Sequence, residues 1–227
     1  MLASPDQSEI DIDIDVKNVY SHMGYAVDCI PSPKISSLVN DYVENAQDLI
    51  QTSYSWAVRD VQGVYGSSVF LDDSIVFESE VISGLLELSQ KVAVFVVTIG
   101  DQLEVLAESL AEEKHILQAT VLEAAGSEAV EKAADHIHCK VGEYADCHDL
   151  VISRRFSPGY CDWDIEQQRM VFRAVGDDNL GVDLMDSCLM VPRKSISGII
   201  GIGTQDANLD KYNPCRTCSR HDCVGRR

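Results

Sequence analysis

The apolar run KVAVFVVTIG, residues 91–100, constrains the fold of this chain more than any other feature. Its centre, VAVFVV at 92–97, is entirely apolar and mostly valine, and Gly100 closes the run. These properties predict a buried strand, and the run is far too short to span a bilayer. The segment SISGIIGIG at 195–203 has the same character, so we expect a second strand there.

Apolar periodicity predicts helices between these two strands and on either side of them. One helix is expected to begin at Ser36 or Ser37, either of which can cap it, and to continue to Ile50. The other helices are expected at 79–89, 101–113, 116–141 and 164–175. Gly126 is expected to bend or break the longest of them, because glycine disfavours a helix interior.

Shorter β-like segments complete the pattern, at 54–58, 61–65, 69–77 and 181–192. The first 15 residues end in alternating acidic residues and isoleucines, which predicts an edge strand or a solvated arm. Long helices in the middle of the chain and β-structure at both ends predict an α+β fold in a single domain with small appendages.

Composition narrows the classes of function. The chain has 227 residues, of which 45% are hydrophobic, and a formal net charge of −19. This charge argues against nucleic acid and anionic membranes as partners. The N-terminal sequence lacks the basic and apolar regions of a secretory signal, so we expect a cytoplasmic protein. Its eight cysteines are then expected to be thiols or metal ligands.

The segment RRFSPGY, residues 154–160, is the first candidate binding element. Pro158 and Gly159 fit the central positions of a type II turn, which can direct amide N–H groups at a ligand. Arg154 or Arg155 can clamp a carboxylate, and Tyr160 adds a flat face with a hydroxyl. The alternative is a surface turn beside a salt-bridged arginine.

The segment EKAADHIHCKV, residues 131–141, is the second candidate. Glu131, Asp135 and His138 have the spacing of one helix face. Carboxylates on that face can receive an ammonium or sulfonium group, and the alternative is a solvated face. His136 and His138 flank Ile137 and point in different directions, so they form a poor metal pair.

The C-terminal segment NPCRTCSRHDC is the third candidate. Cys215, Cys218, His221 and Cys223 are the ligand types of a zinc or iron–sulfur site. The crowding of all four within nine residues differs from the separated ligand pairs of most structural zinc sites. Redox-active thiols and an inert tail are therefore alternatives.

Taken together, four ordered segments resemble the activation domain of cobalamin-dependent methionine synthase, especially its short stand-alone relatives. They are TIGDQLE at 98–104, EAAGSEAVEKAADHIHCKV at 123–141, RFSPGY at 155–160 and DSCLMVPRKSISGIIG at 186–201. The resemblance extends from about Val97 to Tyr212 and implies a single helmet-like α+β domain with an antiparallel sheet and long central helices.

The resemblance also implies roles for individual residues. Arg155 would meet the carboxylate of S-adenosylmethionine, and Glu131 would lie near its methionyl end. Ser157 and Gly159 would line the site, with Tyr160 near the corrin, and Tyr212 would complete it after the last strand. Within this scheme we expect a small N-terminal α/β portion at 1–90, an activation-like core at 91–212 and a Cys-rich tail at 213–227.

The implied function is reactivation of a corrinoid methyltransferase by reductive remethylation of cob(II)alamin with S-adenosylmethionine. The chain lacks the family's usual fused domains, so we expect it to act on a separate methionine synthase or another cobalamin-bearing methyltransferase, together with an electron donor. The alternative is a docking or redox module for a corrinoid protein that transfers no methyl group and whose tail carries a metal or thiol centre.

Overall fold

A computed structural model of the protein describes residues 10, 12–26, 28–176 and 180–216. A six-stranded antiparallel sheet forms its centre, in the strand order β3-β2-β1-β4-β8-β5. The strands are β1 (Ser53–Tyr65), β2 (Ser68–Leu71), β3 (Val76–Glu78), β4 (Lys91–Thr98), β5 (Val151–Phe156) and β8 (Ser195–Gly203). The sheet and its helices confirm the predicted α+β class.

Strands β4 and β8 occupy the interior of the sheet, as their apolar sequences predict. All residues of β4 after Lys91 are buried, because β1 and β8 flank the strand and helices cover both of its faces. Strand β1 is a single 13-residue strand, whereas two separate pieces were predicted over this range. Tight hydrogen bonding of Ser53–Asp60 to β4 explains the continuity.

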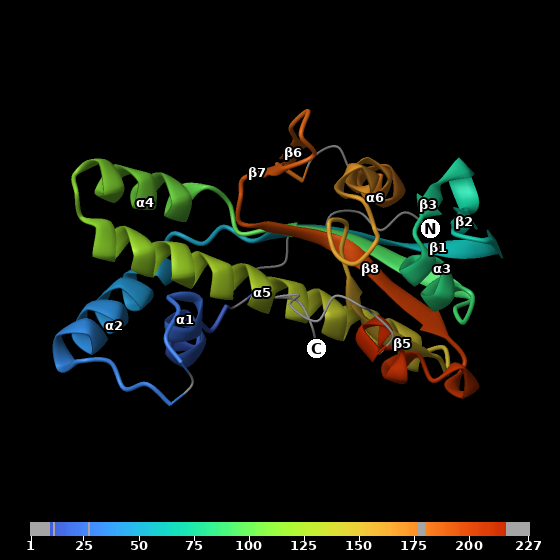
Figure 1. Cartoon of the computed structure of the whole chain (residues 1–227), viewed down its shortest axis with the longest axis horizontal. Coiled ribbons are helices and arrows are strands. Elements are labelled where there is room, and N and C mark those ends of the chain that lie inside the picture. Colours follow the sequence, from blue (N-terminus) through green and yellow to red (C-terminus); the bar gives the residue numbers. More distant parts are fainter. Residues whose placement is uncertain (1–9, 11, 27, 177–179, 217–227) are drawn as a thin grey trace.

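Helices cover the two faces of the sheet unequally (Figure 1). One face carries α1 (Val16–His22), α2 (Pro33–Gln47), α4 (Gln102–Glu112) and the 31-residue α5 (Ile116–Asp146). The other carries α3 (Glu80–Leu86) and α6 (Gln168–Val175). None of the helices in the described ranges is both long and apolar enough to cross a membrane.

Helix α5 continues without interruption through Gly126, so the predicted break there is wrong. Gly126 is buried, and a Cβ atom at this position would lie 3.2 Å from Cε of Lys194. The Lys194 ammonium donates to the Glu123 carbonyl at 2.9 Å and to Ser127 Oγ at 3.0 Å. Glycine at 126 therefore provides space for the lysine side chain that crosses the helix.

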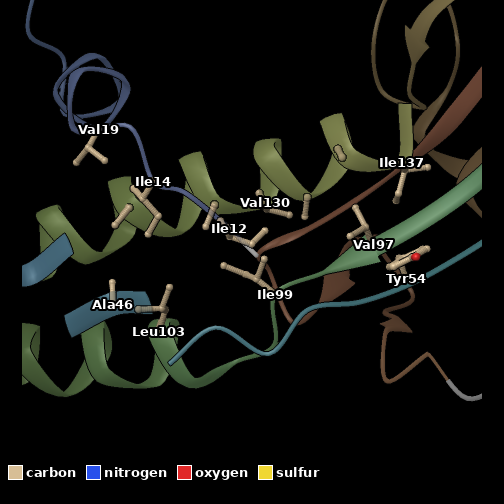
Figure 2. Packing of buried hydrophobic residues seen from close by; sticks show 14 of the residues in the cluster. Ile12, Ile14, Val19, Ala46, Tyr54, Val97, Ile99, Leu103, Val130 and Ile137 are labelled. Carbon is tan, nitrogen blue, oxygen red and sulfur yellow. The ribbon is translucent and has the colours of Figure 1, made fainter. Parts of the chain in front are cut away.

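The acidic N-terminal alternation forms an ordered arm and no strand in the residues described there. Ile12 and Ile14 are buried and point into the core beside α5 (Figure 2), whereas Asp13 and Asp15 are exposed. The Asp15 carboxylate accepts a hydrogen bond from the Lys17 amide and so caps α1. The period-two alternation therefore reflects an extended arm whose isoleucines face the core and whose aspartates face solvent.

Other predicted elements have different bounds. The β segment predicted at 69–77 is divided into β2 and β3 by a short 3-10 helix at Asp72–Ser74. Helix α2 begins at Pro33, three residues before the expected cap, with Ser32 preceding it, because proline suits the first turn of a helix. The predicted strand at 181–192 is a hairpin of two short strands, β6 (Asp183–Leu184) and β7 (Met190–Val191).

Candidate functional site

A β-bulge in the edge strand β5 sets the geometry of the site. Ile152 pairs with Ile202 and Arg155 pairs with Ile200, so β5 contains one more residue than β8 over this stretch. Ser153 Oγ occupies the bulge, where it accepts a hydrogen bond from the Gly201 amide at 2.9 Å. The extra residue restores Arg155 to the face of Ile152, which packs against the α5 side of the core.

Arg155 consequently reaches two carboxylates on α5. Its Nη2 atom lies 3.0 Å from Glu131 Oε2 and 3.0 Å from Asp135 Oδ1. The arginine side chain is 19% exposed, whereas Glu131 and Asp135 are 48% and 62% exposed. The structure therefore brings together Arg155 and Glu131, two of the residues selected from the sequence, and adds Asp135.

The other amino group of the Arg155 guanidinium, Nη1, differs from Nη2 in its hydrogen bonding. Arg155 Nη1 is buried and has no hydrogen-bond partner among the described residues. His138 lies further along the same face of α5, and its buried Nδ1 also lacks a partner in the part of the chain that the structure describes. Burial, and then the positive charge of Arg155, lower the pKa of His138, while Asp135 opposes them.

The turn after β5 contains Ser157, Gly159 and Tyr160. Gly159 has φ of +88°, as a type II turn requires. Its amide donates to the Trp163 carbonyl at 2.8 Å, and the Tyr160 amide approaches the Ser157 carbonyl at 3.4 Å. Both amides therefore bond within the loop, and the ring of Tyr160 is 62% exposed.

Tyr212 lies on the opposite face of the sheet from Arg155. Its hydroxyl donates to the Val81 carbonyl at 2.6 Å, and its ring lies 5.9 Å from that of Phe156. Burial, more than the neighbouring Asp162, raises the pKa of Tyr212. Arg154 is on this face as well, where it donates to Asn213 Oδ1 at 2.9 Å and lies over the Phe156 ring.

Arg155, Glu131 and Asp135 are called the Arg155 cluster below. A groove of about 760 Å³ runs beside this cluster, between the N-terminal arm and α5. Asp135 belongs to both the groove and the cluster. Asp13, Asp15, Lys17 and Lys132 supply other charged side chains to its wall. The groove could not be predicted from local patterns, because its two walls are more than 100 residues apart in the sequence.

Only Cys215 of the predicted metal ligands lies within the described residues, where it is a free thiol. Cys218, His221 and Cys223 lie outside them. Residues 10–216, apart from the gaps at 11, 27 and 177–179, contain no group of three or more metal-ligating side chains that could hold an ion. The metal site in the tail stays a prediction.

The antiparallel sheet, the long helix and the arginine between helix carboxylates define an α+β domain with a charged site beside an edge strand. The family whose sequence model matches the chain is the activation domain of vitamin B12-dependent methionine synthase, over residues 80–212. Because this match spans more than half of the chain, the protein belongs to that family.

Comparison with solved structures supports the same fold. A crystal structure of the MetH reactivation domain bound to AdoHcy is 14% identical to the chain, with a TM-score of 0.59. The similarity covers 82% of this chain and 74% of that one. No curated protein compared with the chain matches it.

His138 is the site residue to which sequence reasoning assigned no role, and Asp135 entered only as one of the helix carboxylates that could receive a cation. Their spacing from Glu131 placed all three on one helix face, which was the available signal. The position of Arg155 beside that face depends on the bulge at Ser153, and no local pattern in RRFSPGY indicates a bulge.

Proposed function

We propose that this protein binds S-adenosylmethionine at the Arg155 cluster and supports reductive remethylation of cob(II)alamin on a separate corrinoid methyltransferase, such as a methionine synthase. The observation that supports this function best is the contact of Arg155 with Glu131 and Asp135. Membership of the activation-domain family supplies the reaction class.

The charges of the cluster suit this ligand. Two carboxylates surround one guanidinium, so the cluster has one negative charge in excess. S-adenosylmethionine carries an ammonium, a sulfonium and a carboxylate, and has one positive charge in excess at neutral pH. The half-exposed Glu131 and Asp135 can turn to the ammonium, while Nη1 of Arg155, which has no partner among the described residues, donates to the carboxylate.

The protein's part in the reaction is to bind and orient. Cobalamin bound by the partner would supply, once its cobalt has been reduced by one electron, the nucleophile for the methyl group. S-adenosylhomocysteine would be the product of the methyl donor. Arg155, Glu131 and the Ser157–Tyr160 turn would fix the methyl donor, and exposed Tyr160 would face the corrin. Tyr212 would support the turn through Phe156 from the other face.

Calorimetric titration of the anaerobically purified protein with S-adenosylmethionine tests the binding site. We expect saturable binding that weakens by at least about 1.5 kcal/mol in Arg155→Ala, since a charge-assisted pair is lost. Arg173→Ala, which removes an exposed arginine of α6, is the matched control and should bind normally. Equal affinity of all three proteins would remove Arg155 from the site.

A methyl-transfer assay separates reactivation from the alternative, a docking or redox module. The protein is mixed with a methionine synthase that lacks its own activation domain and holds cob(II)alamin, a low-potential reductant and methyl-labelled S-adenosylmethionine. We expect label on the cobalamin only when this protein is present. Complex formation without transferred label would favour the docking module.

We also propose that Cys215, Cys218, His221 and Cys223 bind a zinc ion or an iron–sulfur cluster. The ligand types and the C-x-x-C spacing support this site. Elemental analysis should find metal in stoichiometric amount, lost in Cys215→Ser. Metal-free protein after anaerobic purification from metal-replete cells would contradict the proposal.

A further inference from the structure

We infer that His138 is a second anchor for the ligand carboxylate, acting beside Arg155. This inference rests on the proposed binding of S-adenosylmethionine and adds a residue to which neither the sequence resemblance nor the comparisons give a role. It starts from two buried nitrogen atoms, Arg155 Nη1 and His138 Nδ1, that lack hydrogen-bond partners within the described residues.

Unpartnered buried nitrogens carry a free-energy cost that most folded proteins avoid. Here two of them occur on groups close enough for the charge of Arg155 to act on His138. Other charges near them are Asp135 on the same helix and, one turn earlier, Glu131. Both carboxylates bond to Nη2 of Arg155, which leaves Nη1 for another acceptor.

The chemistry of the two groups specifies that acceptor. Nη1 of arginine is always a donor, and Nδ1 of a neutral histidine donates in one of its two tautomers. Burial and Arg155 both favour the neutral form of His138. Two N–H donors, on groups near enough for the charge of one to act on the other, suit one carboxylate, whose oxygens can accept from both.

The inference also assigns opposite ends of the amino-acid moiety. The carboxylate would lie between His138 and Arg155, and the ammonium would lie on the Glu131 and Asp135 side of the guanidinium. Ligands with an ammonium but no carboxylate should therefore be indifferent to His138. This difference separates a ligand contact from a structural effect.

The test compares S-adenosylmethionine with decarboxylated S-adenosylmethionine in calorimetric titrations of the full chain. His138→Phe keeps a flat aromatic ring but removes both nitrogens, so it should weaken the binding of S-adenosylmethionine about tenfold, the loss expected for one hydrogen bond to a charged group. Its affinity for the decarboxylated ligand should change less than twofold. His148→Phe, at an exposed histidine of the same chain segment, is the matched control and should leave both affinities unchanged.

Conservative variants keep the test decisive if His138→Phe does not fold. The side-chain amide of His138→Asn can place a donor where Nδ1 lies, so S-adenosylmethionine should bind within about threefold of the wild-type affinity. His138→Gln shifts the amide toward the position of Nε2 and should lose about tenfold.

Four results would overturn the inference or the proposed function on which it rests. Wild-type affinity of both His138→Phe and His138→Gln would exclude a ligand contact, and an equal loss for the two ligands would indicate a structural role. A wild-type protein that binds neither ligand would overturn the proposed function itself, whereas wild-type binding that depends on Arg155 and not on His138 would overturn this inference alone.

Discussion

Arg154 and Arg155 are neighbours in the sequence and lie on opposite faces of β5, in different chemical surroundings. Arg154 donates to the neutral Asn213 and stacks over Phe156, beside a tyrosine that is also hydrogen-bonded. Arg155 lies between two carboxylates and keeps one buried amino group without a described partner. Protein groups alone hold Arg154, whereas the Arg155 side offers a donor and charges that a zwitterion can satisfy.

Strand β8 packs closely against the end of β5, the strand that carries both arginines. A substitution that disrupts this packing should have the largest effect on the free energy of unfolding. A Cβ atom at Gly198 would lie 2.5 Å from the Phe156 carbonyl oxygen and 3.0 Å from Ser157 Oγ. We expect Gly198→Ala to lower the free energy of unfolding by about 3 kcal/mol, measured by urea denaturation, because backbone must move.

Gly142→Ala is the control for this change. A Cβ atom there would meet only Ile152 Cδ1, at 3.6 Å, and the position is in α5. This substitution should raise stability by about 0.5–1 kcal/mol, since alanine is the better helix former. Similar stabilities of the two variants would contradict the close approach of β8 to Phe156.

The bulge determines which face of β5 Arg155 occupies, and Ser153→Ala tests this role. Removal of Oγ leaves the buried Gly201 amide without its acceptor, which should cost about 1–3 kcal/mol of stability in urea denaturation. Affinity for S-adenosylmethionine should fall with it, because the direction of Arg155 depends on the bulge. Ser197→Ala on β8 removes a buried hydroxyl that has no described partner and should leave both quantities nearly unchanged.

Replacing each arginine by alanine tests the difference between the two faces of β5. Arg154→Ala should cost about 1 kcal/mol of stability, from one hydrogen bond and one cation–π contact, and should retain ligand affinity. Arg155→Ala should show the converse pattern in the same two measurements. Equal loss of affinity in both variants would show that the ligand contacts both faces of β5.

Changes in pH are expected to have the smallest effects on the free energy of unfolding. His138 acts at acid pH and Tyr212 at alkaline pH. The pKa of His138 is below its usual 6.5, so the unfolded chain binds the proton first and stability falls as pH falls below about 6.5. The pKa of Tyr212 is above its usual 10.0, so stability falls as pH rises past that value. His138→Asn should flatten only the acid limb of a pH–stability curve, and Tyr212→Phe only the alkaline limb.

Some elements of the fold and of the candidate site can be predicted from the sequence, and others cannot. The strands at 91–98 and 195–203 and the helix at 102–112 are predictable, because their apolar patterns reflect burial within one segment. Glu131, Asp135 and His138 share a face for the same local reason. The uninterrupted α5 is not predictable, because Lys194, far away in the sequence, fills the space over Gly126.

The pairing of Arg155 with α5 belongs to the unpredictable part. It requires the β5–β8 register, in which a buried serine hydroxyl replaces a strand acceptor. In a strand without the bulge, Arg155 would lie on the opposite face from Ile152 and would point away from α5. Sequence patterns therefore identify the candidate binding groups, and long-range packing decides which of them meet.

The most direct measurement of the central claim is a crystal structure of the protein with S-adenosylhomocysteine, the demethylated product. The account predicts the ligand on the α5 face of β5, its carboxylate within hydrogen-bond distance of Arg155 Nη1 and its ammonium beside Glu131 or Asp135. A ligand bound elsewhere, with Arg155 still held by only the two carboxylates, would contradict it.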